Sequence, residues 1–217
     1  MNQVINYQKE LDRLIEKNTA EGSVPTLLLH SCCAPCSSYC LEYLAQYFHI
    51  TVFYYNPNIS PIEEYERRVL EQQRLIEELI VHYPIDFRLG NYDTERFYAM
   101  AKGLEKEPEG GSRCFNCYEL RLREAAIAAK ELDFDYFTTT LSISPHKNAA
   151  KLNEIGQAVG NEYGVAYLPS DFKKKNGYKR SIELSNEHHL YRQDYCGCVY
   201  SKLEAQSRAM EQENQQE

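Results

Sequence analysis

Short apolar runs alternate with longer amphipathic segments along most of this chain, and that alternation restricts the folds the chain can adopt. Runs rich in apolar and β-branched residues predict strands at 27–29, 50–55, 85–89, 134–140 and 164–169. Segments with helical periodicity separate these runs, at 35–48, 62–81, 93–102, 119–132 and 148–163. Strands connected through helices of this length pair in parallel, so the pattern predicts a three-layer α/β fold with helices on both faces of a mainly parallel sheet.

The chain shows no Gly/Ser-rich or Pro-rich linker, so we expect one domain spanning residues 1–217. Residues 1–20 predict a leading amphipathic helix, and 180–189 a late helix. Residues 205–217 are polar, and we expect a frayed tail there. The first twenty residues are charged and no apolar run reaches transmembrane length, so we expect neither a secretory signal nor a membrane partner. The clustered cysteines favour a reducing, cytoplasmic location.

The first predicted strand ends in a turn that is rich in cysteine. Cys32 and Cys33 are adjacent, Cys36 follows in the same turn, and Cys40 lies one helical turn further on. The carboxyl ends of parallel strands are where open α/β sheets bind ligands. The position of the turn therefore predicts that the first strand faces a functional site.

The remaining four of the eight cysteines form two further clusters. Cys114 and Cys117 follow a glycine-bearing loop, and Cys196 and Cys198 flank a single glycine. Clustering of this kind favours metal or redox chemistry over structural disulfides. Four thiolates suit an iron-sulfur cluster or zinc. Because adjacent cysteines do not form the spaced zinc knuckle, the Cys32 and Cys33 pair favours a cluster; structural zinc and incidental buried thiols are the alternatives.

The Cys196-Gly197-Cys198 segment is a candidate redox pair. Two thiols one residue apart close only a very small ring, and strained disulfides are the readily reduced kind. Gly197 gives the backbone the freedom to bring the two sulfurs together. Extra metal ligands, or an inert reduced pair, are the alternatives.

The formal charge of −8 argues against a uniformly basic, nucleic-acid-binding surface. Charge is uneven, however, since residues 171–180 hold five cations against Asp171 and carry +4, while the remainder carries −12. Cations interleaved with aromatics suit phosphate contacts and base stacking, so this segment is a candidate RNA-binding patch, with a solvated loop as the alternative. The candidate residues are Lys173, Lys174, Lys175, Tyr178, Lys179 and Arg180.

An ordered set of motifs across residues 27–203 closely resembles the cobalamin-independent epoxyqueuosine reductase family of the QueH type. The motifs are HSCCAP at 30–35, YYNPNI at 54–59, EYERR at 64–68, SRCFNC at 112–117, TTTL at 138–141, SPHKN at 144–148 and YRQDYCGC at 191–198. The ordered set is far more specific than any one cysteine pair. The resemblance also implies a three-layer, Rossmann-like fold similar to the adenine-nucleotide alpha-hydrolases, although their phosphate loop is absent and ATP use is not expected.

The resemblance implies a tRNA-modifying oxidoreductase acting in the last step of queuosine synthesis. Such an enzyme reduces epoxyqueuosine at the tRNA wobble position by two electrons, without cobalamin. By motif matching, Cys32, Cys33, Cys114 and Cys117 would ligate a 4Fe-4S cluster, and Cys196 and Cys198 would form a redox-active disulfide that an external electron donor resets.

The same resemblance implies that an additional mononuclear iron can lie beside the cluster. Cys36 is the leading candidate ligand for that iron, because it belongs to the same turn as Cys32 and Cys33. Two other functions remain as alternatives: a structural zinc protein that binds RNA, and a sulfur-transfer enzyme that modifies tRNA.

Overall fold

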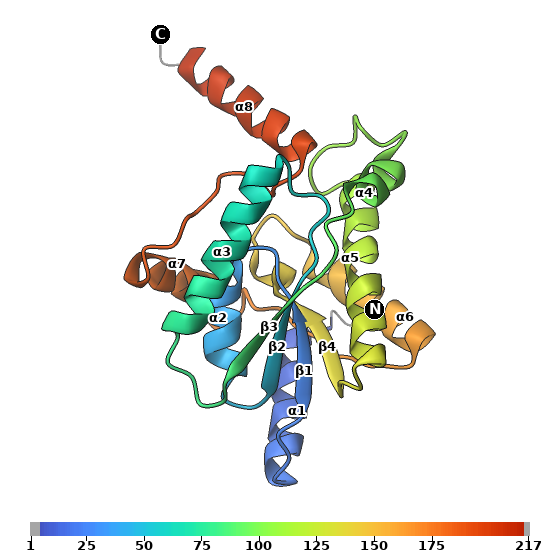
Figure 1. The fold of residues 1–217 in the computed structure, drawn as a ribbon, viewed down its shortest axis with the longest axis vertical. Coiled ribbons are helices and arrows are strands. Elements are labelled where there is room, and N and C mark those ends of the chain that lie inside the picture. Colours follow the sequence, from blue (N-terminus) through green and yellow to red (C-terminus); the bar gives the residue numbers. More distant parts are fainter. Residues whose placement is uncertain (1–4, 215–217) are drawn as a thin grey trace.

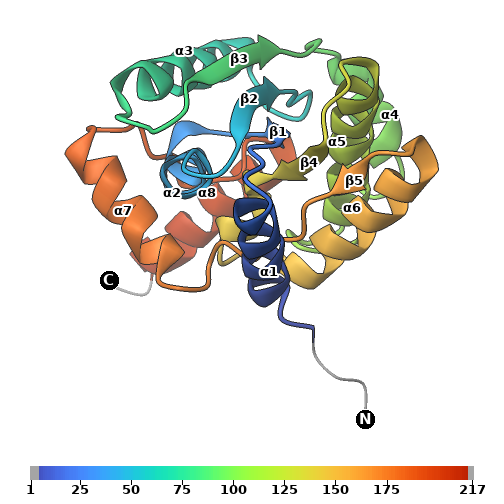
Figure 2. The same cartoon turned by 90° about the horizontal axis from the view of Figure 1, so that it is seen from below.

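A five-stranded, all-parallel sheet organises the computed structural model, which describes residues 5–214 (Figures 1 and 2). The strands follow the order β3-β2-β1-β4-β5 across the sheet. They are β1 (Thr26–His30), β2 (His49–Tyr54), β3 (Ile85–Leu89), β4 (Tyr136–Thr139) and β5 (Ala166–Tyr167). Helices lie on both sides of this sheet, so the predicted three-layer α/β architecture is confirmed.

Two groups of helices cover the sheet. One face carries α1 (Tyr7–Ala20), α2 (Ala34–Leu44), α3 (Ile62–Glu78) and α7 (Gly177–Glu187), and the other carries α4 (Thr94–Ala101), α5 (Ser112–Glu131) and α6 (Ala149–Tyr163). A short 3-10 helix, η1 (Thr140–Ile143), follows β4, and α8 (Val199–Asn214) extends away from the body (Figure 1). Among the described helices, none has the length and apolarity needed to cross a bilayer.

β1 is the central strand and is buried on both faces. Leu27 and Leu29 pack with α1 and α2, whereas Leu28 packs with α5 and α6. A strand covered on both sides needs a continuous apolar run rather than alternation, which explains the three consecutive leucines at its centre. This double burial fixes the end of β1, and the cysteine turn that follows it, in the middle of the carboxyl edge.

Most predicted elements are present with shifted ends. Asp93 caps α4, its side chain accepting a hydrogen bond from the Arg96 amide. The predicted strand at 134–140 is shorter, because the chain turns into η1 after Thr139. The helix predicted at 119–132 begins instead at Ser112, which places Cys114 and Cys117 in its first two turns.

The ends of the chain differ from the sequence-based expectation. The predicted helix at 1–20 is α1, which begins at Tyr7; residues 1–4 lie outside the described residues. In place of a frayed tail at 205–217, α8 continues to Asn214, and 215–217 lie outside the described residues. Glutamine, glutamate and alanine are good helix formers, so a polar segment of this composition can form an exposed helix.

Close packing between α6 and β5 makes Gly156 sensitive to substitution. A Cβ at Gly156 would lie 2.3 Å from a ring carbon of Tyr167. We expect Gly156→Ala to lower the free energy of unfolding by about 1–2 kcal/mol, because overpacking outweighs the helix propensity that alanine gains. The midpoint of urea unfolding measures this change. The matched control is Gln157→Ala at the adjacent exposed position, which should stay within about 0.5 kcal/mol of the parent; an unshifted midpoint for Gly156→Ala would contradict the packing argument.

Candidate thiol redox site

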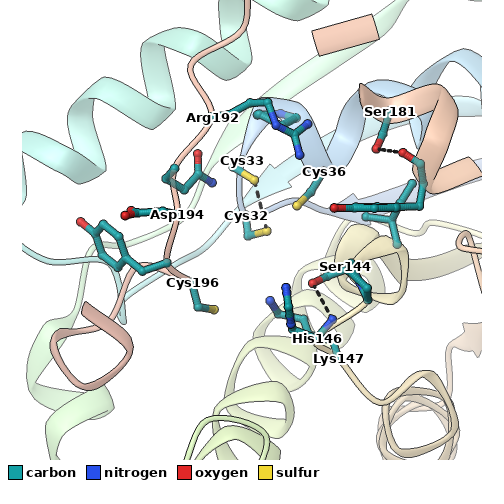
Figure 3. A pocket seen from close by; sticks show the side chains of 16 residues that line it. Cys32, Cys33, Cys36, Ser144, His146, Lys147, Ser181, Arg192, Asp194 and Cys196 are labelled. Atoms are coloured by element: carbon teal, nitrogen blue, oxygen red, sulfur yellow. Dashed lines mark hydrogen bonds between the residues drawn. The ribbon is translucent and has the colours of Figure 1, made fainter. Parts of the chain in front are cut away.

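Three thiols converge in the turn after β1. Cys33 is the N-cap residue of α2 and Pro35 lies in the first turn, where its missing amide hydrogen costs nothing. The sulfur atoms of Cys32, Cys33 and Cys36 all lie within 4.8 Å of one another, with 3.8 Å between Cys32 and Cys33. Figure 3 shows these three side chains gathered at one cavity. The turn therefore presents a soft, all-sulfur donor set of the kind that binds iron or zinc.

The three thiols differ in acidity. Hydrogen bonds from Cys32 and Cys36 hold the pKa of the Cys33 thiol well below its usual value. Because the thiolate is the form that ligates metals and reacts as a nucleophile, Cys33 is the residue of this group best prepared for either role.

His30 anchors the end of β1 to its two neighbouring strands. Its Nε2 lies 3.1 Å from the Tyr55 carbonyl oxygen and its Nδ1 lies 2.9 Å from Thr139 Oγ1. Burial and the positive charge of Arg121 lower the pKa of His30 to about 3, so the ring is neutral. Because a carbonyl oxygen only accepts, the proton resides on Nε2. His30 thus positions the turn and is not a proton donor to substrate.

Buried polar side chains brace the cysteine turn from the α3 side. The Gln72 amide oxygen accepts hydrogen bonds from the hydroxyls of Ser31 and Ser37, at 2.7 and 2.8 Å. The Tyr54 hydroxyl donates to the Cys32 carbonyl oxygen at 3.2 Å. These contacts tie residues on both sides of the turn to α3 and β2, and they restrict where the sulfur atoms can point.

A second group of thiols lines a small adjoining cavity of about 20 Å³, formed by α5 and the segment before α8. Its four cysteines are Cys114, Cys117, Cys196 and Cys198. Burial raises the pKa of Cys114, and that of Cys117 to about 12, so these two thiols are protonated when no metal is bound. Cys196 also lines the larger cavity, which makes it the sulfur shared by the two groups.

The four predicted cluster ligands thus fall in two adjoining groups, Cys32 and Cys33 in one, Cys114 and Cys117 in the other. Cys36 lies with the first group, as expected from its place in the turn. Cys40 does not join either group. It lies on α2, buried in the core on that face of the sheet, and its thiol contacts the Cys36 carbonyl oxygen at 3.4 Å, so it is a packing residue.

Cys196 and Cys198 are free thiols in the structure, as are the other six cysteines. Gly197 between them has a φ of +127°, a conformation that only glycine adopts without strain. A Cβ at Gly197 would also lie 3.0 Å from Arg68 Nη1. The glycine is therefore required both for the bend and for the close approach of Arg68.

Arg68 on α3 holds the segment that carries these two thiols. Its guanidinium is buried, with Nε 2.7 Å from the Glu64 carboxylate and Nη1 donating to the Cys196 carbonyl oxygen at 3.0 Å. It also lies over the Tyr195 ring, 5.4 Å from the centroid. Arg68 was not among the site residues predicted from sequence. Its i, i+4 spacing from Glu64 was a visible signal, but the burial depends on tertiary contacts.

The larger cavity, of about 240 Å³, opens between the cysteine turn, the loop before α6, the start of α7 and residues 192–196. Polar and aromatic side chains surround its mouth. Figure 3 shows His146, Lys147, Arg192 and Asp194 around the thiols, and Tyr178 also lines the wall. A cavity of this size at the carboxyl edge of the sheet accommodates a small polar group next to the sulfur atoms.

The predicted RNA-binding patch divides into two sets of residues. Three of its cations are in internal contacts, namely Lys173 with Asp171, Lys175 with Asp12 and Arg180 with Glu42. Lys174 and Lys179 are exposed, with Lys179 in only a long contact of 4.0 Å with Glu183 on its own helix, and Tyr178 lies at the cavity wall. The first set fastens the segment to its neighbours, and the second is the part of the patch that faces outward.

A parallel α/β sheet with a cavity of converging thiols at its carboxyl edge defines a class of metal- or thiol-dependent redox proteins. Comparison with known proteins agrees with this class. The profile of the family described as "Epoxyqueuosine reductase QueH" matches residues 27–204.

Relatives that carry this description are similar over most of their length. A protein of Staphylococcus epidermidis is 47% identical over 206 residues, which is 93% of this chain and 87% of the relative. A protein of Streptococcus pyogenes serotype M1 is 46% identical over 202 residues, 92% of this chain and 79% of the relative. One of Thermotoga maritima is 35% identical and is covered over 95% of its length. This chain therefore belongs to the epoxyqueuosine reductase QueH family, a family of oxidoreductases.

The Arg68 contacts predict a large cost for removing its charge. Arg68→Gln should lower the free energy of unfolding by about 3 kcal/mol, since it leaves the Glu64 carboxylate buried without its cation. It should also raise the rate at which a thiol reagent labels Cys196. Arg74→Gln is the matched control, because Arg74 lies on the same helix and pairs with Glu71 and Glu78 at a position that is more solvent-accessible than that of Arg68; its loss should be smaller, about 1 kcal/mol. Equal losses for the two variants would refute the role given to Arg68.

Proposed function

We propose that this chain reduces epoxyqueuosine in tRNA to queuosine. One observation carries the proposal: the Cys32, Cys33 and Cys36 thiols and Cys196 line one cavity of about 240 Å³ in a member of the epoxyqueuosine reductase family. The reaction removes the epoxide oxygen as water and leaves an alkene, which takes two electrons and two protons. A dithiol that becomes a disulfide releases two electrons and two protons, so the stoichiometry fits the Cys196 and Cys198 pair.

In this proposal, Cys32, Cys33, Cys114 and Cys117 hold a 4Fe-4S cluster. Support comes from the donor chemistry, since both groups supply only sulfur, and from two cations, the buried Arg121 and the half-buried Lys147, that line the smaller cavity. Cys36 is placed to ligate an additional iron, because its sulfur lies within 4.8 Å of those of Cys32 and Cys33. When bound, the cluster supplies the electron transfer and Lewis acidity that the epoxide requires.

The chain's own residues would contribute burial of the sulfur atoms, an aromatic surface and a redox-active dithiol. Cys32 and Cys33 are buried apart from the cavity that they line, which limits the contact of their sulfur atoms with bulk water. Tyr178 on the cavity wall offers an aromatic face to a nucleobase. Cys196 and Cys198 then become oxidised, and an external electron donor restores their thiols. This scheme uses no cobalamin.

The tRNA wobble nucleotide must leave the anticodon stack to reach this cavity. The patch of Lys173, Lys174, Lys175, Tyr178, Lys179 and Arg180 borders the cavity through Tyr178 and remains our proposal for the backbone contact. Within it, Lys174 and Lys179 are the residues assigned to phosphates, because both are exposed whereas Asp12 holds the exposed Lys175.

The cluster assignment predicts which thiols are needed for iron. Anaerobically purified protein should contain about four iron atoms per chain, or more if the second iron is bound, with matching sulfide. Cys114→Ala should lose most of this iron and the reduction of epoxyqueuosine-containing tRNA. Cys40→Ala, which removes a buried thiol outside both groups, is the matched control and should keep both. Iron-free, zinc-loaded parent protein would refute the cluster.

The outward part of the patch predicts a salt-dependent effect on RNA binding. The double variant Lys174→Gln and Lys179→Gln should weaken binding of epoxyqueuosine-containing tRNA and reduce the slope of log affinity against log salt by about 2. Iron content should not change. Lys130→Gln is the control, since Lys130 is an exposed lysine near the end of α5, at the opposite edge of the sheet. Unchanged affinity and slope in the double variant would exclude this surface.

A further inference from the structure

Arg121 is a fully buried cation with no carboxylate partner in the described part of the chain. It lies on α5 and is 1% exposed. Its Nε donates to the Cys117 carbonyl oxygen at 3.2 Å, and its Nη1 donates to the Asn56 side-chain oxygen at 3.4 Å. Nη2 is buried and has no hydrogen-bond partner among the described residues. Neutral acceptors alone therefore surround a full positive charge.

The other two large buried arginines show that this is unusual within the same protein. Arg68 pairs with Glu64, and Arg113 pairs with Glu204. Each of these cations has an anion that compensates the loss of hydration. Since an isolated charge is expensive to bury, Arg121 requires a compensating negative charge of another kind.

The groups around Arg121 that can become anionic are thiols. Arg121 lines the small cavity together with Cys114, Cys117, Cys196 and Cys198. Burial alone lowers the pKa of Arg121, whereas Cys117 and Cys196 raise it once they are ionised. The guanidinium is thus placed where thiolates, once formed, would supply the missing charge.

Asn56 links Arg121 to the other group of thiols. Its side-chain oxygen accepts from Arg121, and its Nδ2 donates to the Ser31 carbonyl oxygen at 2.7 Å, directly before Cys32. The guanidinium is therefore fixed relative to both thiol groups, between α5 on one side and the cysteine turn on the other.

We infer that Arg121 is the internal counter-charge of the thiolate-bound iron-sulfur cluster and raises its reduction potential. The inference rests on the proposed cluster. One-electron reduction adds one negative charge to the cluster, and a fixed cation in a region of low dielectric stabilises the reduced state more than the oxidised state. Arg121 acts through the thiolates and does not contact the substrate, so it is a positioning residue.

The test is a potentiometric titration of the anaerobic, cluster-containing enzyme, followed by its visible absorbance. Arg121→Gln should reduce the equilibrium constant for cluster reduction at least tenfold, which is about 59 mV for a one-electron couple. Arg121→Lys, which keeps the charge, should stay within about threefold of the parent. Arg123→Gln is the matched control: it removes the same charge from the same helix, at a surface position paired with Glu119 and Glu162, and should not shift the potential.

A second variant keeps the inference testable if Arg121→Gln does not fold. Asn58→Asp is isosteric and places a carboxylate in the same cavity, so it should also lower the potential. A cluster whose potential is unchanged in Arg121→Gln, or in Asn58→Asp where the first variant is unfolded, would overturn the inference. A shift of tenfold or more in Arg121→Lys would also overturn it, because charge would then not be the cause. A parent protein without a cluster would instead refute the proposed cofactor, which is a distinguishable result.

Discussion

The position of β1 in the centre of the sheet is the constraint on which the rest of the site depends. Parallel pairing with β2 and β4 on either side brings the end of β1 next to the ends of both neighbours. The turn after it is therefore enclosed on two sides before any side chain is considered. His30 reinforces this arrangement by contacting Thr139 of β4 and Tyr55 just after β2. The three sulfur atoms of the turn are therefore held at the floor of a cavity rather than on a surface loop.

Two other segments bring the remaining four thiols to the site, and two buried arginines lie against these segments. Cys114 and Cys117 arrive on the first turns of α5, and Cys196 and Cys198 arrive on a segment near the end of the chain. Arg68 fixes that segment by donating to the Cys196 carbonyl oxygen while Glu64 balances its charge, whereas Arg121 has no carboxylate partner among the described residues. One buried arginine thus serves to hold backbone in place, and another supplies charge.

Much of the fold followed from the sequence, because a central strand buried on both faces has a distinctive apolar run and because helix periodicity is strong in 62–81 and 148–163. The clusters of cysteines were also visible, and so was the cysteine turn at the strand end. The sequence could not show that Cys114 and Cys117 share a cavity with Cys196 and Cys198, since that depends on how α5 and the last segment pack. Arg121 carried no local signal at all. The patch cations look uniform in sequence, whereas the fold pairs Lys175 with the distant Asp12 and Arg180 with Glu42.

The start of α8 immediately after Cys198 has a mechanical consequence. Ser201, in the first turn of α8, donates its hydroxyl to the Cys198 carbonyl oxygen at 3.0 Å, so the second thiol belongs to the helix, while Arg68 anchors the first thiol to α3. Beyond what rotation of the two side chains allows, a change in the separation of the sulfurs must be taken up by rotation at Gly197 or by displacement of α8 as a rigid rod. Since α8 projects from the body of the protein, a small movement at its base becomes a large one at its far end (Figure 1).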